Sequence, residues 1–107
     1  MNRNHLERLG RNEALFREVN ERITELGERL EEDRLDIVCE CADVECAARI
    51  ELPYLEYEQA REDEATFIVV DGHEDRSTQR VVQRGNRYVF VEALGDAATV
   101  AAETDPR

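Results

Sequence analysis

The stretch CECADVEC, residues 39–46, contains all three cysteines of the protein in the spacing C-x-C-x4-C. The apolar residues Ile37 and Val38 precede this stretch, and segment 49–52 (RIEL) follows it. This pattern predicts a strand, a tight loop and a second strand. Residues i and i+2 of a strand point to the same face, so Cys39 and Cys41 can approach one ion together. The loop then turns the chain so that Cys46 can join them, and the stretch therefore predicts a metal site.

The number and setting of the cysteines argue against disulfides. A disulfide framework needs an even cysteine count and a secretory context, whereas this chain has three cysteines. Residues 1–10 are charged and lack the apolar region of a signal peptide, and no stretch reaches the ~18 apolar residues of a membrane span. We therefore expect a cytoplasmic protein with no membrane association, in which reduced thiols bind a metal or take part in redox chemistry.

A tetrahedral zinc ion needs one ligand beyond three thiolates. The chain has two histidines, and His5 lies in a polar N-terminal segment that is expected to fray. His73 closely follows the apolar run 67–70 and lies behind Gly72, which suits an imidazole that reaches a neighbouring strand. We therefore predict a structural Cys3His zinc site, with iron as the alternative metal. Its ligands are Cys39, Cys41, Cys46 and His73, and the competing fourth ligands are Asp71, Glu74, Asp75 or a water molecule.

Two other interpretations of the cysteines stay open at this stage. Free cysteines are often small buried apolar residues, and Cys39 on an apolar strand fits that description. Clustered thiols can also form a redox pair. Cys41 and Cys46, however, have acidic neighbours such as Glu40, which are unusual in a core, and this favours metal binding over either alternative.

Composition and charge narrow the classes of function. The chain has 107 residues, enough for one domain with a modest core, and 41% of them are hydrophobic. The net charge of −12 argues against general binding to nucleic acid or to an anionic membrane. Residues 35–75 contain thirteen acidic residues against two arginines, whereas residues 76–92 contain four arginines against one glutamate. We favour intramolecular complementarity as the reason, with a docking surface for a basic partner as the alternative.

An amphipathic helix is predicted from Asn12 to about residue 31. Asn12 can serve as its N-cap, and apolar residues then recur at helical spacing. These residues, the apolar stripe, are Leu15, Phe16, Val19, Ile23, Leu26 and Leu30. The stripe can cover the sheet of its own domain, which is the commoner arrangement, or it can pair with the same helix of a second chain to form a homodimer.

Five strands and a short second helix are predicted after this helix. The strands span residues 35–41, 47–52, 66–71, 78–84 and 87–93, and the helix runs from Pro53 to about residue 63. Gly85–Asn86 is expected to form the two-residue turn of a hairpin. The segment from Asp96 to Glu103 is either a short helix or disordered.

The predicted fold class is therefore α+β, with the N-terminal amphipathic helix packed on a small, mainly antiparallel sheet of about five strands. We divide the chain into a flexible N-terminus (residues 1–11), a single α+β domain (residues 12–94) and a flexible C-terminal tail (residues 95–107).

With these motifs in view, the chain resembles a group of short actinobacterial proteins. The features that carry the likeness are the CECADVEC loop, the GHE triplet at 72–74, the NEALFREVNERI segment at 12–23 and the ETDPR ending. That group combines F-x-C-E-C-x4-C with P-G-H-E and a Val-rich hairpin, and the likeness covers nearly all of the chain. It implies that the three cysteines and His73 form one constellation, and it implies no activity. Asp71 stands where the group's pattern has proline.

The sequence contains no phosphate-binding loop, no G-x-S-x-G and no helical H-E-x-x-H. A zinc ion with four protein ligands is saturated, so we expect a protein-interaction or regulatory module without catalytic activity, whose protein partner the sequence does not identify. The alternative is a thiol-based redox switch that releases zinc on oxidation. A nucleic-acid binder and a small metalloenzyme rank below both, and the former would use Arg76, Arg80, Arg84 and Arg87 with Tyr88.

Overall fold

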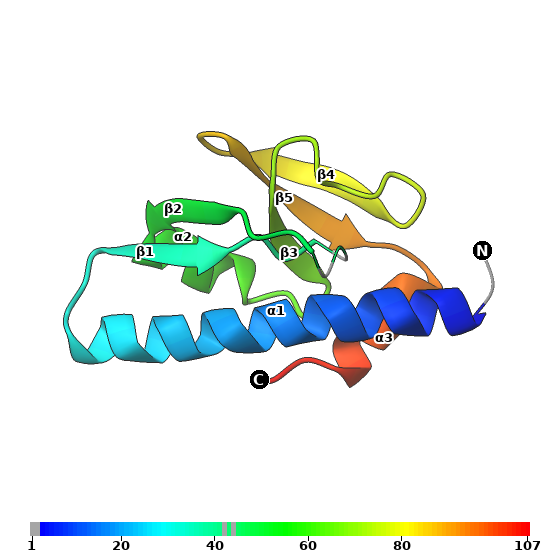
Figure 1. The fold of residues 1–107 in the computed structure, drawn as a ribbon, viewed down its shortest axis with the longest axis horizontal. Coiled ribbons are helices and arrows are strands. Elements are labelled where there is room, and N and C mark those ends of the chain that lie inside the picture. Colours follow the sequence, from blue (N-terminus) through cyan, green and yellow to red (C-terminus); the bar gives the residue numbers. More distant parts are fainter. Residues whose placement is uncertain (1–2, 42, 44) are drawn as a thin grey trace.

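The computed structural model describes residues 3–41, 43 and 45–107, so Ala42 and Val44 of the predicted cysteine loop lie outside the described residues. Within these ranges the elements are α1 (Arg3–Arg29), β1 (Arg34–Val38), β2 (Arg49–Pro53), α2 (Tyr54–Ala60), β3 (Thr66–Val70), β4 (Gln79–Arg84), β5 (Tyr88–Ala93) and α3 (Asp96–Glu103). Figure 1 shows α1 running along one side of the molecule, with both sheets above it. The chain therefore has an α+β fold with an N-terminal helix, as predicted.

The described strands form two antiparallel sheets. β1 pairs with β2, while β3, β5 and β4 lie side by side in that order. In the first sheet Leu35 is opposite Leu52 and Ile37 is opposite Ile50, and all four side chains are buried. The alternation of buried and exposed residues along β1 and β2 directs these side chains into one core. The prediction of about five antiparallel strands is confirmed, and the structure adds their division into two sheets.

β3 is the apolar centre of the fold. Phe67, Ile68 and Val69 are almost completely buried. β3 pairs with β5 along its whole length, and Ile68 lies opposite Phe90. The continuous apolar run in the sequence therefore marks a strand that is covered on both faces, as its pattern predicts.

The hairpin between β4 and β5 turns one residue later than predicted. The Gly85 N–H donates a hydrogen bond of 2.9 Å to the Tyr88 carbonyl, so the two central residues of the turn are Asn86 and Arg87. Arg87 has a positive φ of 70°. The ring of Tyr88 lies against Gly85, where a Cβ would come within 2.3 Å of it. The glycine is therefore needed for this close approach to Tyr88, and not as a central residue of the turn as the sequence predicts.

Helix α1 begins at Arg3, so the predicted start at Asn12 was wrong and Asn12 lies inside the helix. Packing on α3 explains the extension beyond the apolar pattern. Gly10 approaches Val100 so closely that a Cβ on Gly10 would lie 2.2 Å from Val100 Cγ1. Tertiary contact therefore supports helical turns that carry no local signal. The flexibility of residues 1–11 stays a prediction, and its first two residues lie outside the described part of the chain.

The face of α1 that is turned toward the sheets is polar, which corrects the predicted role of the apolar stripe. The buried polar side chains of this helix are Glu13, Arg17, Asn20 and Thr24. The stripe contributes Ile23, which packs against the core, while Phe16 is half-buried and Leu15, Val19, Leu26 and Leu30 are exposed. The hydrophobic pattern failed here because strands far away in the sequence supply polar partners for the buried residues.

Arg17 illustrates how this polar face is accommodated. Its guanidinium donates hydrogen bonds to the carbonyls of Glu64 at 2.8 Å and Thr66 at 3.0 Å. It also lies over the ring of Phe67, 3.8 Å from the ring centroid. Burial lowers the pKa of Arg17, and the nearby charge of Arg61 lowers it further. The carbonyls of Glu64 and Thr66 therefore replace water at Nη2 of a completely buried cation, whereas its Nε and Nη1 have no hydrogen-bond partner among the described residues.

The C-terminal segment packs against the rest of the chain. Residues Asp96–Glu103 are helical, so the helical alternative for this segment is confirmed. Beyond α3, Asp105 forms an ion pair with the buried guanidinium of Arg61, whose Nε also donates to Glu21 Oε1 at 2.9 Å. These contacts connect the C-terminal end to α1 and to the end of α2. The flexibility of residues 95–107 is a statement about motion and stays a prediction.

Candidate metal centre

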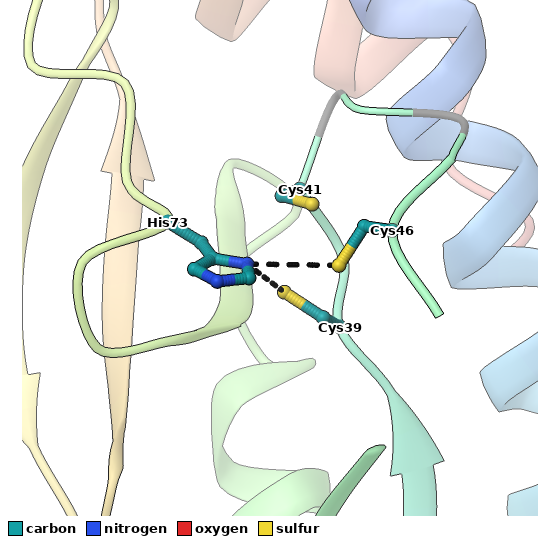
Figure 2. A group of neighbouring side chains, drawn as sticks. All are labelled: Cys39, Cys41, Cys46 and His73. Carbon is teal, nitrogen blue, oxygen red and sulfur yellow. Dashed lines mark hydrogen bonds between the residues drawn. The ribbon is translucent and has the colours of Figure 1, made fainter. Parts of the chain in front are cut away.

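The four predicted ligands lie together in the structure. Cys39 directly follows β1, Cys41 and Cys46 lie in the loop between β1 and β2, and His73 lies in the loop after β3. One ligand atom from each residue lies within 4.8 Å of all the others. Figure 2 shows the three thiols and the imidazole gathered between these two loops. These side chains are therefore close enough together to bind one metal ion.

The distances fit a tetrahedral ion. Nδ1 of His73 lies 3.6 Å from Cys39 Sγ and 3.6 Å from Cys46 Sγ. Tetrahedral zinc bonds of about 2.3 Å to sulfur and about 2.0 Å to nitrogen separate a sulfur and a nitrogen ligand by about 3.6 Å. The same geometry places two sulfur ligands about 3.8 Å apart. Adjustments of about 1 Å are therefore enough to bring the whole set, which lies within 4.8 Å, to coordinating geometry.

A tight turn positions His73. The carbonyl of Val70, the last residue of β3, accepts a hydrogen bond of 2.8 Å from the His73 N–H. Between them Gly72 has a φ of 96°, a conformation that residues with a side chain rarely adopt. The Gly72 N–H also donates to Oε1 of Glu74 at 2.8 Å. The turn leaves Nδ1 of the imidazole facing the thiols (Figure 2).

Hydrogen bonds hold the cysteine loop at both ends. The Cys39 N–H donates to the Ala48 carbonyl at 3.0 Å, which extends the pairing of β1 and β2 by one residue. The Cys46 N–H donates to the Asp43 carbonyl at 3.0 Å, which closes a turn. The Val70 N–H donates to Cys39 Sγ at 3.3 Å, so β3 contacts a ligand atom directly. The sulfur atoms are therefore positioned by backbone that belongs to both sheets.

Glu40 lies between two candidate ligands and is fully buried, and Cys41 is buried too, so the prediction that acidic neighbours keep Cys41 out of the core was wrong. Its Oε1 accepts the Ile68 N–H at 3.0 Å, and its Oε2 accepts an N–H of the Asn20 amide at 2.8 Å. The Glu40 N–H donates to the Ile68 carbonyl at 2.9 Å. The hydroxyl of Tyr57 donates to Oε2 at 3.4 Å. Glu40 thus pairs with the edge of β3 that β5 leaves free, and it connects this edge to α1.

The sequence held a signal for the burial of Glu40. When Cys39 and Cys41 point to one face of an extended segment, the residue between them points to the opposite face. The C-x-C spacing that brings two thiols together therefore directs Glu40 to the opposite face, where Asn20 and Ile68 enclose it. The partner on α1, Asn20, has no such local signal, because the two residues are 20 positions apart.

Burial disfavours charged thiolates in the absence of a cation. Burial raises the pKa of the Cys39 thiol to about 12, and burial also raises the pKa of Cys41. The pKa of Glu40 is raised by burial too, while its hydrogen bond from Asn20 and the charge of Arg17 oppose this shift. A divalent cation offsets the cost for the thiols, because metal ligation stabilises the deprotonated form.

The competing acidic ligands are engaged elsewhere. Asp71 and Glu74 each form an ion pair with an arginine, at 3.3 Å and 3.2 Å. Oδ1 of Asp75 accepts hydrogen bonds from the N–H and the hydroxyl of Ser77, at 3.0 Å and 2.6 Å. These contacts favour His73 over the carboxylates as the fourth ligand.

Three of the four arginines of segment 76–92 have acidic partners, two in the acidic segment and one, Glu92, in their own segment. The ion pairs are Arg76–Glu74 at 3.2 Å, Arg80–Glu92 at 3.5 Å and Arg84–Asp71 at 3.3 Å. Tyr88 is buried, and its hydroxyl donates to Oε2 of Glu56 at 2.9 Å. These contacts are consistent with intramolecular complementarity between the acidic and basic segments.

Comparisons with known proteins add no relatives. No family model matches the sequence, and no curated protein and no solved structure matches it either. The resemblance to the actinobacterial group therefore stays a prediction. In the part of the chain that the structure describes, none of the helices combines the length and the apolar character needed to cross a bilayer.

Proposed function

We propose that this domain binds one structural zinc ion through Cys39, Cys41, Cys46 and His73. The observation that supports the proposal most strongly is the convergence of one ligand atom from each residue within 4.8 Å. His73 lies 27 positions after Cys46, so the fold rather than the local sequence brings the imidazole to the thiols. The two sulfur–nitrogen separations of 3.6 Å support the proposal, because a tetrahedral zinc ion holds its sulfur and nitrogen ligands at about this distance.

The donor set selects the metal and the type of site. Thiolate ligands favour zinc over magnesium or calcium, which prefer oxygen ligands. Three thiolates and one imidazole complete a tetrahedral shell and leave no open position for a substrate, which is typical of structural zinc sites. Iron bound in the same four-ligand geometry is the alternative metal.

Such an ion would connect the two sheets. Its cysteine ligands come from the end of β1 and the following loop, and its imidazole comes from the loop after β3. Binding free energy at a site of this kind contributes to folding, because the unfolded chain has no preformed site. We therefore propose a cytoplasmic protein-interaction or regulatory module without catalytic activity, in which the ion holds the two sheets in one arrangement.

Titration with Co²⁺ tests this proposal, because Co²⁺ occupies tetrahedral zinc sites and its thiolate complexes absorb strongly. We expect metal-free protein to bind about one Co²⁺ per chain with tetrahedral thiolate bands that added Zn²⁺ abolishes. The variant H73Q should bind more weakly, and the matched control H5Q, at the other histidine, should match the unaltered chain. Protein that binds no Co²⁺, or equal effects of H73Q and H5Q, would contradict the proposed ligand set.

Access to the site supports the redox switch as a second candidate. Cys46 is half-buried, and a hollow of about 270 Å³ lined by Cys41, Asp43, His73 and Asp75 adjoins the ligands. Peroxide can oxidise two of the thiolates to one disulfide, while two protons are taken up and the peroxide is reduced to two waters. Loss of two ligands would release the ion.

Zinc release under oxidation tests this candidate separately. Zinc-loaded protein treated with hydrogen peroxide should release its zinc as thiols are lost, and a thiol reductant with added zinc should restore both. Zinc that stays bound and thiols that stay unreactive would exclude the switch and leave the structural site intact.

A further inference from the structure

The side of α1 that faces away from the sheets carries four large apolar side chains. Their exposed fractions are 55% for Leu15, 40% for Val19, 54% for Leu26 and 61% for Leu30. Single exposed apolar residues are common on protein surfaces and need no explanation. Four exposed apolar residues in one row along a helix do require an explanation. We call these four residues the outer row.

The outer row occupies a narrow strip of the helix. At 3.6 residues per turn, its positions fall within an arc of about 60° and extend over about 22 Å of the helix axis. A strip this narrow is typical of a helix that packs along a second helix, whereas a helix that covers a sheet uses a wider face. The wider buried face of α1 is already used by the polar side chains that meet the sheets.

The spacing of the outer row is the same in both directions along the chain. The intervals between Leu15, Val19, Leu26 and Leu30 are four, seven and four residues. A two-fold symmetric dimer requires a surface that is complementary to itself under rotation. An antiparallel copy of this helix meets that requirement, because reversal of the row reproduces it.

We propose that α1 pairs with α1 of a second copy of this chain, in antiparallel orientation, about a two-fold axis that passes between the two helices at the level of Arg22 and Ile23. Leu15 then lies opposite Leu30 of the partner subunit, and Val19 lies opposite Leu26 of the partner subunit. Each apolar side chain of the outer row is covered by an apolar side chain of the other copy, which removes it from water. The pairing is independent of the proposed zinc site.

Charges beside the outer row support the antiparallel orientation. Glu18, Arg22, Glu25 and Arg29 follow one edge of it with alternating sign, and all four are exposed. In an antiparallel pair this edge meets its own reversed copy, so Glu18 comes alongside Arg29 of the partner subunit and Arg22 alongside Glu25 of the partner subunit. Each pair is offset by about 3 Å along the axis, within the reach of these side chains. In a parallel pair the edge would meet the opposite edge of the row, which contains Phe16 and Ile23.

The balanced charge of this edge matters because the chain as a whole carries a net charge of −12. Two such chains repel each other over most of their surfaces, and like charges in contact oppose association. The four charged residues beside the outer row sum to zero, so a second copy can approach here without that penalty.

Hollows at both ends of the row leave space for the partner's side chains. One of about 530 Å³ adjoins Leu15 and is also lined by Ala14, Thr104 and Pro106, and its other lining residues are charged: Arg11, Glu18, Glu21, Arg22 and Glu25. The other, of about 410 Å³, adjoins Leu26 and Leu30 and is lined by Leu35 among others. The two-fold axis brings the Leu30 end of each helix to the first hollow and the Leu15 end to the second.

Sedimentation equilibrium of the full chain at concentrations from about 10 µM to 1 mM tests the proposal. We expect the mass to rise with concentration from 12.4 kDa to twice that value. The variant L26E should weaken the dimer by about tenfold or more, because it places a charge in the apolar contact. The matched control L55E introduces the same change at an exposed leucine of α2, 77% exposed, and should leave the dimer unchanged.

Charge exchange tests the orientation. E18R and R29E should each weaken the dimer, and the double variant E18R/R29E should restore it, because the antiparallel pair then exchanges the two charges across the interface. A double variant weaker than both single variants would overturn the antiparallel register. A monomer at every concentration, or equal effects of L26E and L55E, would overturn the proposal that the outer row forms a dimer interface. Far-ultraviolet circular dichroism of each variant verifies that it remains folded.

Discussion

The side-chain amide of Asn20 donates a hydrogen bond of 2.8 Å to Oε2 of Glu40, and this contact joins α1 to the residue between the candidate metal ligands Cys39 and Cys41. The orientation of the amide is fixed by Val38. Asn20 Oδ1 accepts the Val38 N–H at 2.8 Å, and its Nδ2 donates to the Val38 carbonyl at 2.9 Å. The amide therefore presents only an N–H to Glu40. Because Oε1 of Glu40 also faces an N–H donor, that of Ile68, both carboxylate oxygens must act as acceptors.

Glu40→Gln tests this arrangement. A glutamine has one acceptor oxygen, so its NH₂ group must face either Asn20 or the Ile68 N–H, and a buried donor is left without an acceptor. We expect the free energy of unfolding to fall by about 1–3 kcal/mol in urea denaturation. The matched control Glu45→Gln changes an exposed acid of the same loop and should alter stability by less than about 0.5 kcal/mol. Equal stability of the two variants would show that the buried carboxylate is dispensable.

Asp105→Ala should have a larger effect. Arg61 is buried, and Asp105 accepts its hydrogen bond and lies 4.0 Å from the buried guanidinium of Arg17. Removal of the carboxylate leaves two buried cations without this counter-charge, and we expect a loss of about 3 kcal/mol in unfolding free energy. The control Asp36→Ala removes an exposed pair with Arg49 and should cost less than about 1 kcal/mol. If both variants lost the same amount, the buried pair would be no more important than a surface one.

Asp105 also predicts sensitivity to acid. Burial alone would raise the pKa of Asp105, but the Arg107 N–H and the charge of Arg61 together lower it below its usual value of 3.8. A carboxyl group with a lowered pKa in the folded state stabilises the protein above the unfolded-state pKa. This contribution is lost as the pH falls below about 4. The stability difference between the unaltered chain and Asp105→Ala should therefore shrink in urea denaturation at pH 3 compared with pH 6.

Much of the candidate site was predictable because its signals are local. The C-x-C spacing directly after a strand, the turn before Cys46 and a histidine just after an apolar strand are each visible within a few residues. Only the meeting of His73 with the thiols required the fold, and the scarcity of histidines left few candidates. Strand positions were predictable for the same reason, since alternation and apolar runs report burial residue by residue.

The inner face of α1 was not predictable from the pattern. Hydrophobic periodicity assumes that the apolar side of a helix is the buried side. Here the acceptors for Arg17 are the carbonyls of Glu64 and Thr66, 47 and 49 positions away. The acceptors for the amide of Asn20 are the Val38 carbonyl and the Glu40 carboxylate, 18 and 20 positions away. No local window contains these partners. The apolar stripe is a helical face, as predicted, but the favoured interpretation that it covers the sheet was wrong for Leu15, Val19, Leu26 and Leu30, which are exposed.

Glu13 should make the free energy of unfolding decrease as the pH rises from about 4.5 toward 7. Burial, with smaller contributions from the charges of Glu40 and Asp75, raises its pKa to about 7 despite the nearby Arg17 and a hydrogen bond of 2.8 Å from Gln79. Because this folded-state pKa exceeds the unfolded value of 4.5, the unfolded state loses its proton first. Stability is then lost as the pH rises from about 4.5 to about 7, by an amount on the order of 3 kcal/mol, and the loss levels off above that pH.

Glu13→Gln should remove this loss. The difference in unfolding free energy between pH 5 and pH 8 should be smaller in the variant than in the unaltered chain, as measured by urea denaturation at both values. The exposed Glu18 provides the matched control, and Glu18→Gln should keep the pH dependence of the unaltered chain. If the free energy of unfolding of Glu13→Gln still fell between pH 5 and pH 8, a group other than Glu13 would cause the pH dependence.

Metal removal should weaken the connection between the sheets. A chelator should lower the melting temperature of the unaltered chain by about 10 °C or more, because ligation stabilises only the folded state. The variant Cys46→Ser, which lacks one ligand, should melt lower at the outset and respond less to the chelator. Identical responses of the two proteins would mean that the chelated ion does not depend on Cys46.

The most direct test of the central claim is the zinc content of the full chain, purified without chelator and measured by elemental analysis against the protein concentration. Ligation by Cys39, Cys41, Cys46 and His73 predicts about one zinc per chain, and less in Cys39→Ser and in Cys46→Ser. Protein that contains no metal, or that retains the same zinc content after both substitutions, would contradict it.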